Sequence, residues 1–245
     1  MDAEKIKEKF FELYKKEPQL VRSPGRVNLI GEHTDYNQGF VLPASIDKEV
    51  VCALAKNNSS ICQFYAFDLK EKYEVDLSNL QKSEKGWPDY LMGVIEQVQK
   101  AGHEIDGFDC VIGGDIPLGA GLSSSAAIEC AMVFGINELF QLNIDRLAMV
   151  KMAQMAENEF VGVKCGIMDQ FASMFGEPES VIKLDCRTLE YEHFHFDMSD
   201  YIIVLCDTNV KHSLASSEYN TRRKECESGV ALVQKKYSQV KSLRD

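Results

Sequence analysis

Basic residues and long apolar runs are both scarce in this sequence of 245 residues. It holds 27 Lys and Arg against 38 Asp and Glu, which gives a formal net charge of −11. Nucleic acids and anionic membranes are bound through a basic face, so this balance argues against either as a partner. Apolar runs such as residues 201–206 are far shorter than the roughly 20 residues of a membrane-spanning helix. The sequence therefore predicts no nucleic-acid partner and no membrane partner.

Paired cysteine motifs are absent as well. The eight cysteines are spread along the chain without any Cys-x-x-Cys spacing, so neither a zinc site nor a thioredoxin-like redox motif is indicated. Unpaired cysteines in apolar segments are typical of a reducing compartment. The first residues, Met1-Asp-Ala-Glu-Lys-Ile-Lys7, are charged and do not resemble the apolar core of a signal peptide. We therefore expect a globular protein of the cytoplasm.

The most informative stretch is Gly113-Gly-Asp-Ile-Pro-Leu-Gly-Ala-Gly-Leu-Ser-Ser-Ser-Ala-Ala127. A strand-like run, residues 108–112, precedes it and apolar residues at helical spacing follow it, which predicts a strand, a loop and a helix. Gly119 and Gly121 let the backbone approach a ligand closely, and the serines after them supply hydroxyl groups and free N–H groups at the helix start. Such a helix start suits a polyphosphate, whereas a simple Ser-capped helix is the alternative for the serines alone.

Two known phosphate-binding patterns are missing from this stretch. It has no Gly-Lys-Ser or Gly-Lys-Thr ending, which a Walker loop requires. The run Gly-Ala-Gly-Leu-Ser-Ser also lacks the third glycine of the dinucleotide-binding motif. A polyphosphate site here would therefore belong to another class of protein.

A dense group of charged residues lies nearer the N-terminus. Arg26, Glu32, His33 and Asp35 crowd around the turn expected at Gly31. A simple loop does not require so many charges, although a solvated acidic loop is the alternative. Carboxylates and imidazole can accept several hydroxyl hydrogens at fixed geometry, which is the chemistry of a sugar site.

Two further carboxylates stand in apolar settings. Glu157 shares the apolar face of a helix that we expect to start at Asp145. Burying a carboxylate is costly unless it is paired or binds a cation, so we expect either an ion pair or a metal ion there. Asp169 lies within the largely apolar run 167–171, where a helix cap is the alternative to a chemical role.

Taken together, these motifs resemble those of the GHMP small-molecule kinases. Residues 117–126, Pro-Leu-Gly-Ala-Gly-Leu-Ser-Ser-Ser-Ala, are similar to the phosphate loop of that family. Residues 25–37, Gly-Arg-Val-Asn-Leu-Ile-Gly-Glu-His-Thr-Asp-Tyr-Asn, resemble the signature of its galactokinase branch. Residues 165–170, Cys-Gly-Ile-Met-Asp-Gln, and residues 208–223 resemble segments of the same branch.

The resemblance implies a role for each matching residue. It makes Asp169 the catalytic base and places Arg26 beside the reacting oxygen. The residues that it implies for the sugar are Glu32, His33, Thr34, Asp35, Gly166 and Tyr219. The residues that it implies for ATP are Gly119, Ala120, Gly121, Leu122, Ser123, Ser124 and Ser125, and it places Trp87 near the adenine. Ser125 and Glu157 would be the two protein ligands of Mg²⁺, which usually keeps phosphates and waters as its other ligands.

Mixed strands and helices predict an α+β fold, with one sheet covered by helices. We expect helices at residues 4–16, after Trp87, after the phosphate loop and after Asp145. We expect strands at residues 47–55, 62–67, 72–77, 181–185 and 201–206. The first three of these strands would form an antiparallel sheet. The resemblance implies the GHMP kinase fold. Residues 1–198 would form an N-terminal domain like ribosomal protein S5 domain 2, and residues 199–245 the incomplete beginning of a ferredoxin-like C-terminal domain. Galactokinases are longer and carry a third, glycine-rich motif that is missing here, so we expect a truncated chain.

The function implied by the resemblance is ATP-dependent phosphorylation of D-galactose at the anomeric hydroxyl, a step of galactose catabolism. An N-acetylgalactosamine kinase shares these motifs and is one alternative. A regulator that senses galactose and ATP without turnover is another. Known sensors of that kind lose residues from the Ser-Ser-Ser-Ala run, which is intact at residues 123–126 and favours the enzyme. We expect a monomer.

Overall fold

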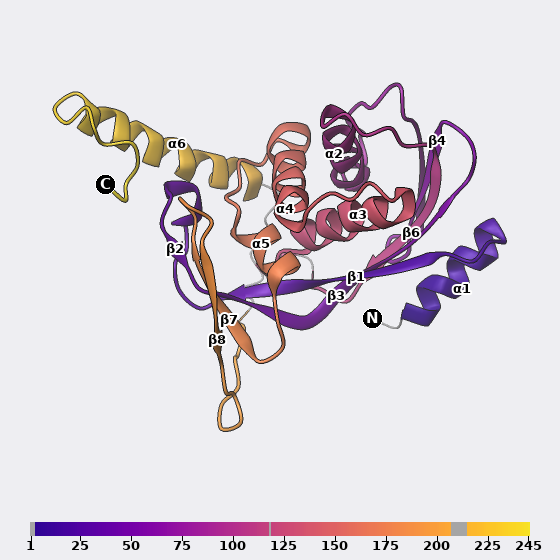
Figure 1. Cartoon of the computed structure of the whole chain (residues 1–245), viewed down its shortest axis with the longest axis horizontal. Coiled ribbons are helices and arrows are strands. Elements are labelled where there is room, and N and C mark those ends of the chain that lie inside the picture. The colour runs from indigo at the N-terminus through magenta and orange to yellow at the C-terminus, as the bar shows by residue number, and fades with distance from the viewer. Residues whose placement is uncertain (1–2, 118, 207–214) are drawn as a thin grey trace.

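The computed structural model describes residues 3–117, 119–206 and 215–245 (Figure 1). Within these ranges the main sheet has five strands in the order β1-β3-β6-β4-β5. The strands are β1 (Gln19–Asn28), β3 (Pro43–Lys56), β4 (Ile61–Ala66), β5 (Glu71–Asp76) and β6 (Phe108–Gly114). Neighbours are antiparallel except β4 and β6, which run parallel. The predicted antiparallel sheet of β3, β4 and β5 is therefore wrong in one respect, because the almost wholly buried β6 separates β3 from β4.

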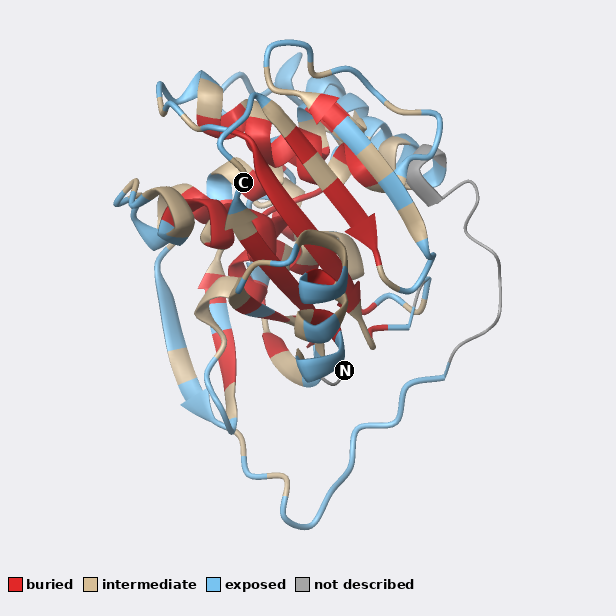
Figure 2. Ribbon diagram, turned by 90° about the vertical axis from the view of Figure 1, so that its right-hand side faces the viewer, coloured by how far each residue is buried: buried red, intermediate tan, exposed pale blue. Residues whose placement is uncertain are grey.

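The sheet is buried on both faces, which Figure 2 shows as a red centre under paler outer elements. Successive side chains of β3 point to opposite faces, as the period of two in a strand requires. Cys52 and Leu54 belong to the large core under the helices. Val51 and Ala53 belong to a smaller core that α1 (Ala3–Tyr14) covers. The central strands are therefore held rigidly between two helical layers.

The helical layer that faces the large core carries most of the candidate site. Its members are α2 (Trp87–Lys100), α3 (Ser124–Phe140), α4 (Arg146–Met155), the π-helical turn η2 (Ala156–Val161) and α5 (Met168–Phe175). The predicted helix starts at Trp87 and after Asp145 are confirmed, and the Asp145 side chain accepts a hydrogen bond from the N–H of Ala148 as an N-cap. The helix predicted after the phosphate loop is also confirmed.

A second, three-stranded sheet supports α5. Its strands are β2 (Phe40–Val41), β7 (Ser180–Asp185) and β8 (Tyr191–His195), in the order β2-β7-β8. Ile182 and Leu184 of β7 pack with Phe171 of α5 in a separate apolar cluster. This cluster fixes the orientation of α5 relative to the main sheet. The strand predicted at residues 181–185 is confirmed, whereas β1, β2 and β8 were not predicted.

The C-terminal part departs most from the sequence-based expectation. Residues 201–206, predicted as a strand, are exposed and form no strand, so that prediction is wrong. A strand needs a neighbour for its N–H and C=O groups, and none of the strands in the described residues pairs with this run. The helix α6 (Ala215–Gln234) extends away from the body of the molecule (Figure 1). Residues 207–214, part of the segment that resembles galactokinases, lie outside the described residues. The domain division at residue 198 stays a prediction.

In the described ranges, no helix is both long and apolar enough to cross a lipid bilayer.

Candidate active site

The predicted phosphate loop connects β6 to α3, as the sequence indicated. Gly119 and Gly121 have φ angles of 77° and 71°, in the left-handed region that favours glycine, and open space surrounds both. Ser123 also has a positive φ, 60°, and stands at the N-cap position of α3 without a capping hydrogen bond from its side chain. The simple capping interpretation is therefore wrong for Ser123. A non-glycine residue in this conformation is strained, which points to a functional constraint.

The Ser123 hydroxyl is instead used to hold Asp169. Ser123 Oγ donates to Asp169 Oδ2 at 2.6 Å, and Arg26 Nε donates to Asp169 Oδ1 at 2.7 Å. Arg26 Nη1 also donates to the carbonyl oxygen of Gly121 at 2.7 Å. Strand β1, the loop and the first turn of α5 therefore meet at one carboxylate. The side chain of Asp169 keeps 25% of its surface exposed, so a ligand can still reach it.

The charge of Arg26 is secured by its surroundings. Burial by itself lowers the pKa of Arg26, but the carboxylates of Asp169, Glu32 and Asp35 outweigh burial and raise that pKa above its usual value. Arg26 follows an irregularity in the pairing of β1 with β3, where the register shifts between Pro24 and Arg26. One residue of β1 lies opposite three of β3 at this point, and irregularities of this kind, such as β-bulges, often re-aim a side chain next to an active site.

The predicted sugar residues lie around the same point. Asp35, on the short helix η1 (Asp35–Asn37), is only 9% exposed. Burial, followed by the charge of Asp169, raises the pKa of Asp35 to about 6. A Cβ atom at Gly166 would collide with the Asp35 carboxyl group, so any larger residue at that position would displace Asp35. The structure therefore brings Asp35, Gly166 and Asp169 together.

The side chains of the other predicted sugar residues differ in their hydrogen-bond partners within the protein. His33 Nδ1 is hydrogen-bonded to Tyr36 Oη at 2.6 Å, and the His33 ring lies 5.6 Å from the Tyr219 ring on α6. Glu32 Oε1 accepts a hydrogen bond from Asn28 Nδ2 at 2.7 Å. Thr34 Oγ1 lies within hydrogen-bond distance of the backbone oxygens of residues 31 and 40, so this hydroxyl closes the turn, and its role toward the sugar stays a prediction.

The predicted metal residues Glu157 and Ser125 also lie together. Glu157 stands on η2 and is 6% exposed. Burial, then the charge of Asp169, raises the pKa of Glu157 to about 7, and a hydrogen bond with the Ser125 side chain acts in the opposite direction. In the part of the chain that the structure describes, no cationic side chain pairs with Glu157; its partners there include Gln170 Nε2 at 2.9 Å. The ion pair that we considered for Glu157 is therefore not found among these residues.

Sequence reasoning missed two residues beside Glu157. Glu129 on α3 and Gln170 on α5 are both fully buried, and Gln170 Nε2 donates to Glu129 Oε2 at 3.1 Å. Burial, and next the charge of Glu157, raises the pKa of Glu129 well above its usual value. A carboxylate on an apolar helix face was the signal that singled out Glu157, and the same signal applied to α3 would have found Glu129.

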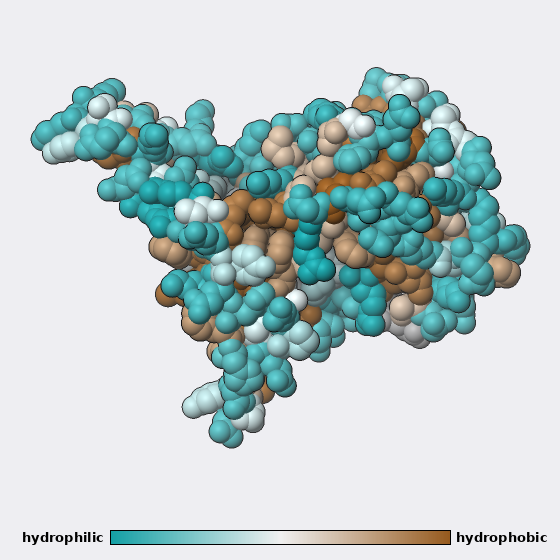
Figure 3. All heavy atoms as spheres, viewed as in Figure 1, coloured by the Kyte–Doolittle hydropathy of each residue, from teal (hydrophilic) through white to brown (hydrophobic). Residues whose placement is uncertain are grey.

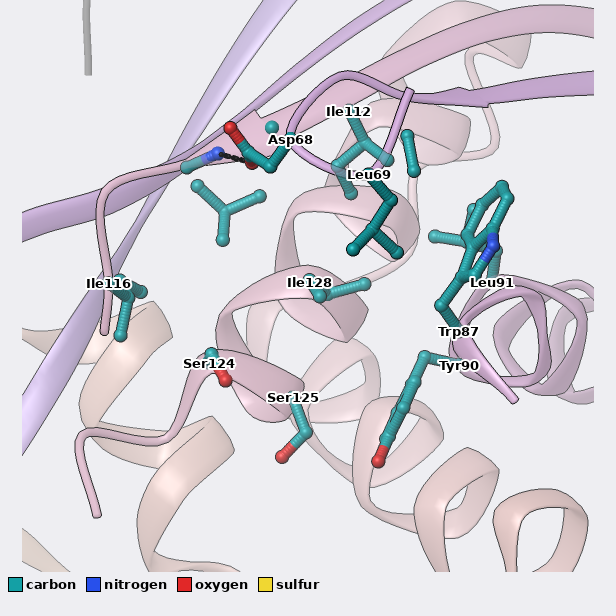
Figure 4. Close-up of a pocket in the computed structure, with 14 residues that line it drawn as sticks. Asp68, Leu69, Trp87, Tyr90, Leu91, Ile112, Ile116, Ser124, Ser125 and Ile128 are labelled. Carbon is teal, nitrogen blue, oxygen red and sulfur yellow. Dashed lines mark hydrogen bonds between the residues drawn. The ribbon is translucent and has the colours of Figure 1, made fainter. Parts of the chain in front are cut away.

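A cavity of about 310 Å³ opens beside the start of α3 (Figure 4). Its lining includes Trp87 and Tyr90 of α2, Leu69, and Ser124 and Ser125 of α3. The Trp87 indole is fixed because its Nε1 donates to Glu71 Oε2 at 3.1 Å. Figure 3 shows a mostly hydrophilic face with apolar surface over the middle of the molecule, around α2 and α3. The cavity therefore offers apolar walls at one end and serine hydroxyls at the other.

Comparison with known proteins shows the family and the fold of the chain. Residues 89–177 match the family description "GHMP kinases N terminal domain", and residues 8–56 match "Galactokinase galactose-binding signature". A mevalonate kinase from Methanococcus jannaschii has the same fold, with a TM-score of 0.65 at 16% identity over 86% of this chain and 70% of that one. The chain belongs to the GHMP kinase family, and the predicted fold is confirmed.

Within that family the chain is similar to several galactokinases. It is 49% identical to the galactokinase of Thermosipho africanus over 88% of this chain and 60% of that protein. It is 41% identical to the galactokinase of a Roseiflexus species over 100% of this chain and 63% of that protein. The galactokinase of Lactococcus lactis, solved in complex with galactose, matches with a TM-score of 0.90 and 40% identity over 96% of this chain and 62% of that chain. The chain thus spans about three fifths of the length of these relatives.

Proposed function

We propose that this chain supplies the ATP- and sugar-binding part of a kinase that phosphorylates D-galactose at its anomeric hydroxyl. The observation that carries the proposal is Asp169, which is held by Arg26 and Ser123, is open to a ligand on one side and lies beside buried Asp35. We propose residues 1–198 as the N-terminal GHMP domain and residues 199–245 as the beginning of the C-terminal one. A monomer in the cytoplasm completes the proposal.

The reacting hydroxyl would be placed at Asp169. Phosphoryl transfer depends mainly on positioning and on stabilisation of charge, with one carboxylate orienting the hydroxyl. Asp169 accepts the hydroxyl proton, the sugar oxygen bonds to the terminal phosphorus of ATP, and the bond from that phosphorus to ADP breaks. The guanidinium of Arg26 offsets negative charge on the attacking oxygen. Asp35 and Glu32 accept hydrogen bonds from other hydroxyls of the sugar.

The nucleotide would occupy the 310 Å³ cavity. Its walls at Trp87 and Tyr90 suit the flat adenine, and the N–H groups at the start of α3 suit the phosphates. Mg²⁺ fits beside them, because Glu157 is a buried carboxylate without a described cationic partner and lies near the Ser125 side chain. Ser125 and Glu157 would hold it, and a bound Mg²⁺ would neutralise charge on the phosphates.

The assay that tests this function compares sugars. The product of the complete gene is incubated with Mg²⁺ and ATP and with either D-galactose or N-acetylgalactosamine, and ADP formation is measured. We expect ADP to form with D-galactose and to depend on its concentration. ADP formation with N-acetylgalactosamine alone would identify the other kinase. Binding of galactose and ATP without ADP formation would identify a sensor.

The affinity for D-galactose is expected to fall as the pH is lowered through about 6. Asp35, whose burial raises its pKa to about 6, is ionised above that pH and protonated below it. Protonation removes an acceptor for the sugar hydroxyls, and a lost buried hydrogen bond costs about 1–3 kcal/mol, or roughly 5- to 150-fold in affinity. Calorimetric titrations with galactose on both sides of this pH measure the effect.

Two variants control the pH experiment. Asp35→Ala should bind galactose about tenfold or more weakly, without the pH dependence, and should still bind nucleotide. Asp47→Ala removes an exposed carboxylate from β3 and should behave like the parent protein. Equal loss of sugar and nucleotide binding in Asp35→Ala would indicate misfolding. An unchanged pH dependence in that variant would show that another group titrates.

A further inference from the structure

Gln170 occupies an unusual position in the buried polar cluster behind the phosphate loop. Its side chain is 0% exposed, and its single amide nitrogen donates to two carboxyl groups, Glu157 Oε2 at 2.9 Å and Glu129 Oε2 at 3.1 Å. The nitrogen of the Gln170 amide, rather than its oxygen, faces both carboxyl groups. Gln170 thus joins α3, η2 and α5 at one atom.

The position of Gln170 matters because it directly follows Asp169 in the chain. Asp169 precedes it in the first turn of α5 and is held on the other side by Arg26 and Ser123. The two acidic groups that the proposed reaction needs, Asp169 and Glu157, are therefore linked through consecutive residues of one helix. A shift of Gln170 would change the distance between them.

Burial makes this link hard to replace. Glu157 is 6% exposed and Glu129 is fully buried, so water cannot readily take over the hydrogen bonds of Gln170. Glu129 Oε1 and Gln170 Oε1 have no hydrogen-bond partner among the described residues. The Cys165 thiol is a weak donor to Glu157 Oε2 at 3.5 Å. Among the side-chain contacts of Glu157 in the described residues, the one with Gln170 Nε2 at 2.9 Å is shorter than the one with Cys165 Sγ at 3.5 Å.

We propose that Gln170 is a positioning residue, which orients Glu157 toward the metal and phosphates and sets its place relative to Asp169, with Glu129 as the second anchor of the Gln170 amide. This inference rests on the proposed function, because it takes Glu157 to be a metal ligand. Groups that orient a metal ligand typically change metal affinity by 10–100-fold when they are removed. Gln170 touches neither the sugar nor the nucleotide in this assignment.

The test measures how strongly Mg²⁺ promotes nucleotide binding, without relying on turnover. ADP is titrated calorimetrically into the protein with and without Mg²⁺, and the ratio of the two affinities is compared among variants. Gln170→Met removes the amide donor while keeping the side-chain length. We expect it to reduce the effect of Mg²⁺ by roughly tenfold or more, while metal-free ADP binding stays within about twofold of the parent.

Two further variants keep the result interpretable. Ser173→Ala removes another buried polar group of α5, one that bonds Ser23 and the carbonyl oxygen of Pro24, and should leave both affinities unchanged. Glu129→Met removes the second anchor without touching residue 170. Like Gln170→Met, it should reduce the effect of Mg²⁺ on ADP binding. If Gln170→Met fails to fold, this variant tests the positioning role in its place.

The outcomes separate this inference from the function on which it rests. If Glu157→Gln abolishes the effect of Mg²⁺ but Gln170→Met and Glu129→Met retain it in full, Gln170 does not position the ligand. If the parent protein binds ADP equally well with and without Mg²⁺, the metal role of Glu157 is refuted and the inference falls with it. If Ser173→Ala also loses the effect of Mg²⁺ on ADP binding, the loss in all three variants would come from general loosening of α5, and the inference would be overturned.

Discussion

Asp169→Asn is expected to lower the turnover of D-galactose by roughly two to four orders of magnitude, the usual contribution of a general base. The amide keeps the shape of the side chain and can still accept from Arg26, but it cannot take up the proton of the sugar hydroxyl. Binding of galactose and of ATP should therefore persist. Steady-state assays of the complete gene product, with calorimetry for the two ligands, measure both parts of the expectation.

Asp145→Asn is the matched control for this substitution. Asp145 caps α4, and asparagine caps helices about as well as aspartate, so this variant should retain parental turnover. A rate within a few-fold of the parent for Asp169→Asn would show that Asp169 is not the base. Direct transfer assisted by Arg26 would then be the better mechanism, and Arg26→Ala should cause the larger loss.

Glu157→Gln is expected to abolish Mg²⁺-dependent turnover, with a loss of about two orders of magnitude or more, while the protein still folds. In the folded protein the charged form of Glu157 is disfavoured, because burial and Asp169 raise its pKa to about 7. The unfolded chain ionises this group at lower pH, so its charge costs stability as the pH rises toward 7. Melting in metal-free buffer above that pH should therefore occur at an equal or higher temperature in the variant.

Glu159→Gln provides the comparison. Glu159 lies two residues away on η2, is 40% exposed and pairs with Lys100. Its replacement should leave the magnesium requirement unchanged and have little effect on stability, since surface ion pairs contribute little. Retention of the full magnesium dependence by Glu157→Gln would assign Glu157 a structural role. A large drop in its melting temperature without metal would contradict the expected cost of the buried charge.

The elements that the sequence predicted well are those whose signal is local. Helix α2 follows from the spacing of Leu91, Val94, Ile95 and Val98, all of which are fully buried. The loop before α3 follows from its glycines, which need no distant partner to adopt positive φ angles. The motifs also indicated the family, because a short run such as residues 117–126 is specific to that family. Residues 201–206 failed as a strand because pairing depends on a neighbour that local pattern does not supply.

The family, the order of most elements and the residues to examine follow from the sequence alone, because they depend on local spacing and on motif identity. How those residues meet depends on packing between elements that are far apart in the chain. Arg26 and Asp169 are 143 positions apart, and the register shift in β1 together with the cluster that orients α5 brings them into hydrogen-bond contact. Packing also turned Ser123 from an expected cap into a partner of Asp169 and placed Gln170 between two buried carboxyl groups. Such contacts depend on how side chains from separate elements fill a shared interior, and periodicity along one element carries no information about them.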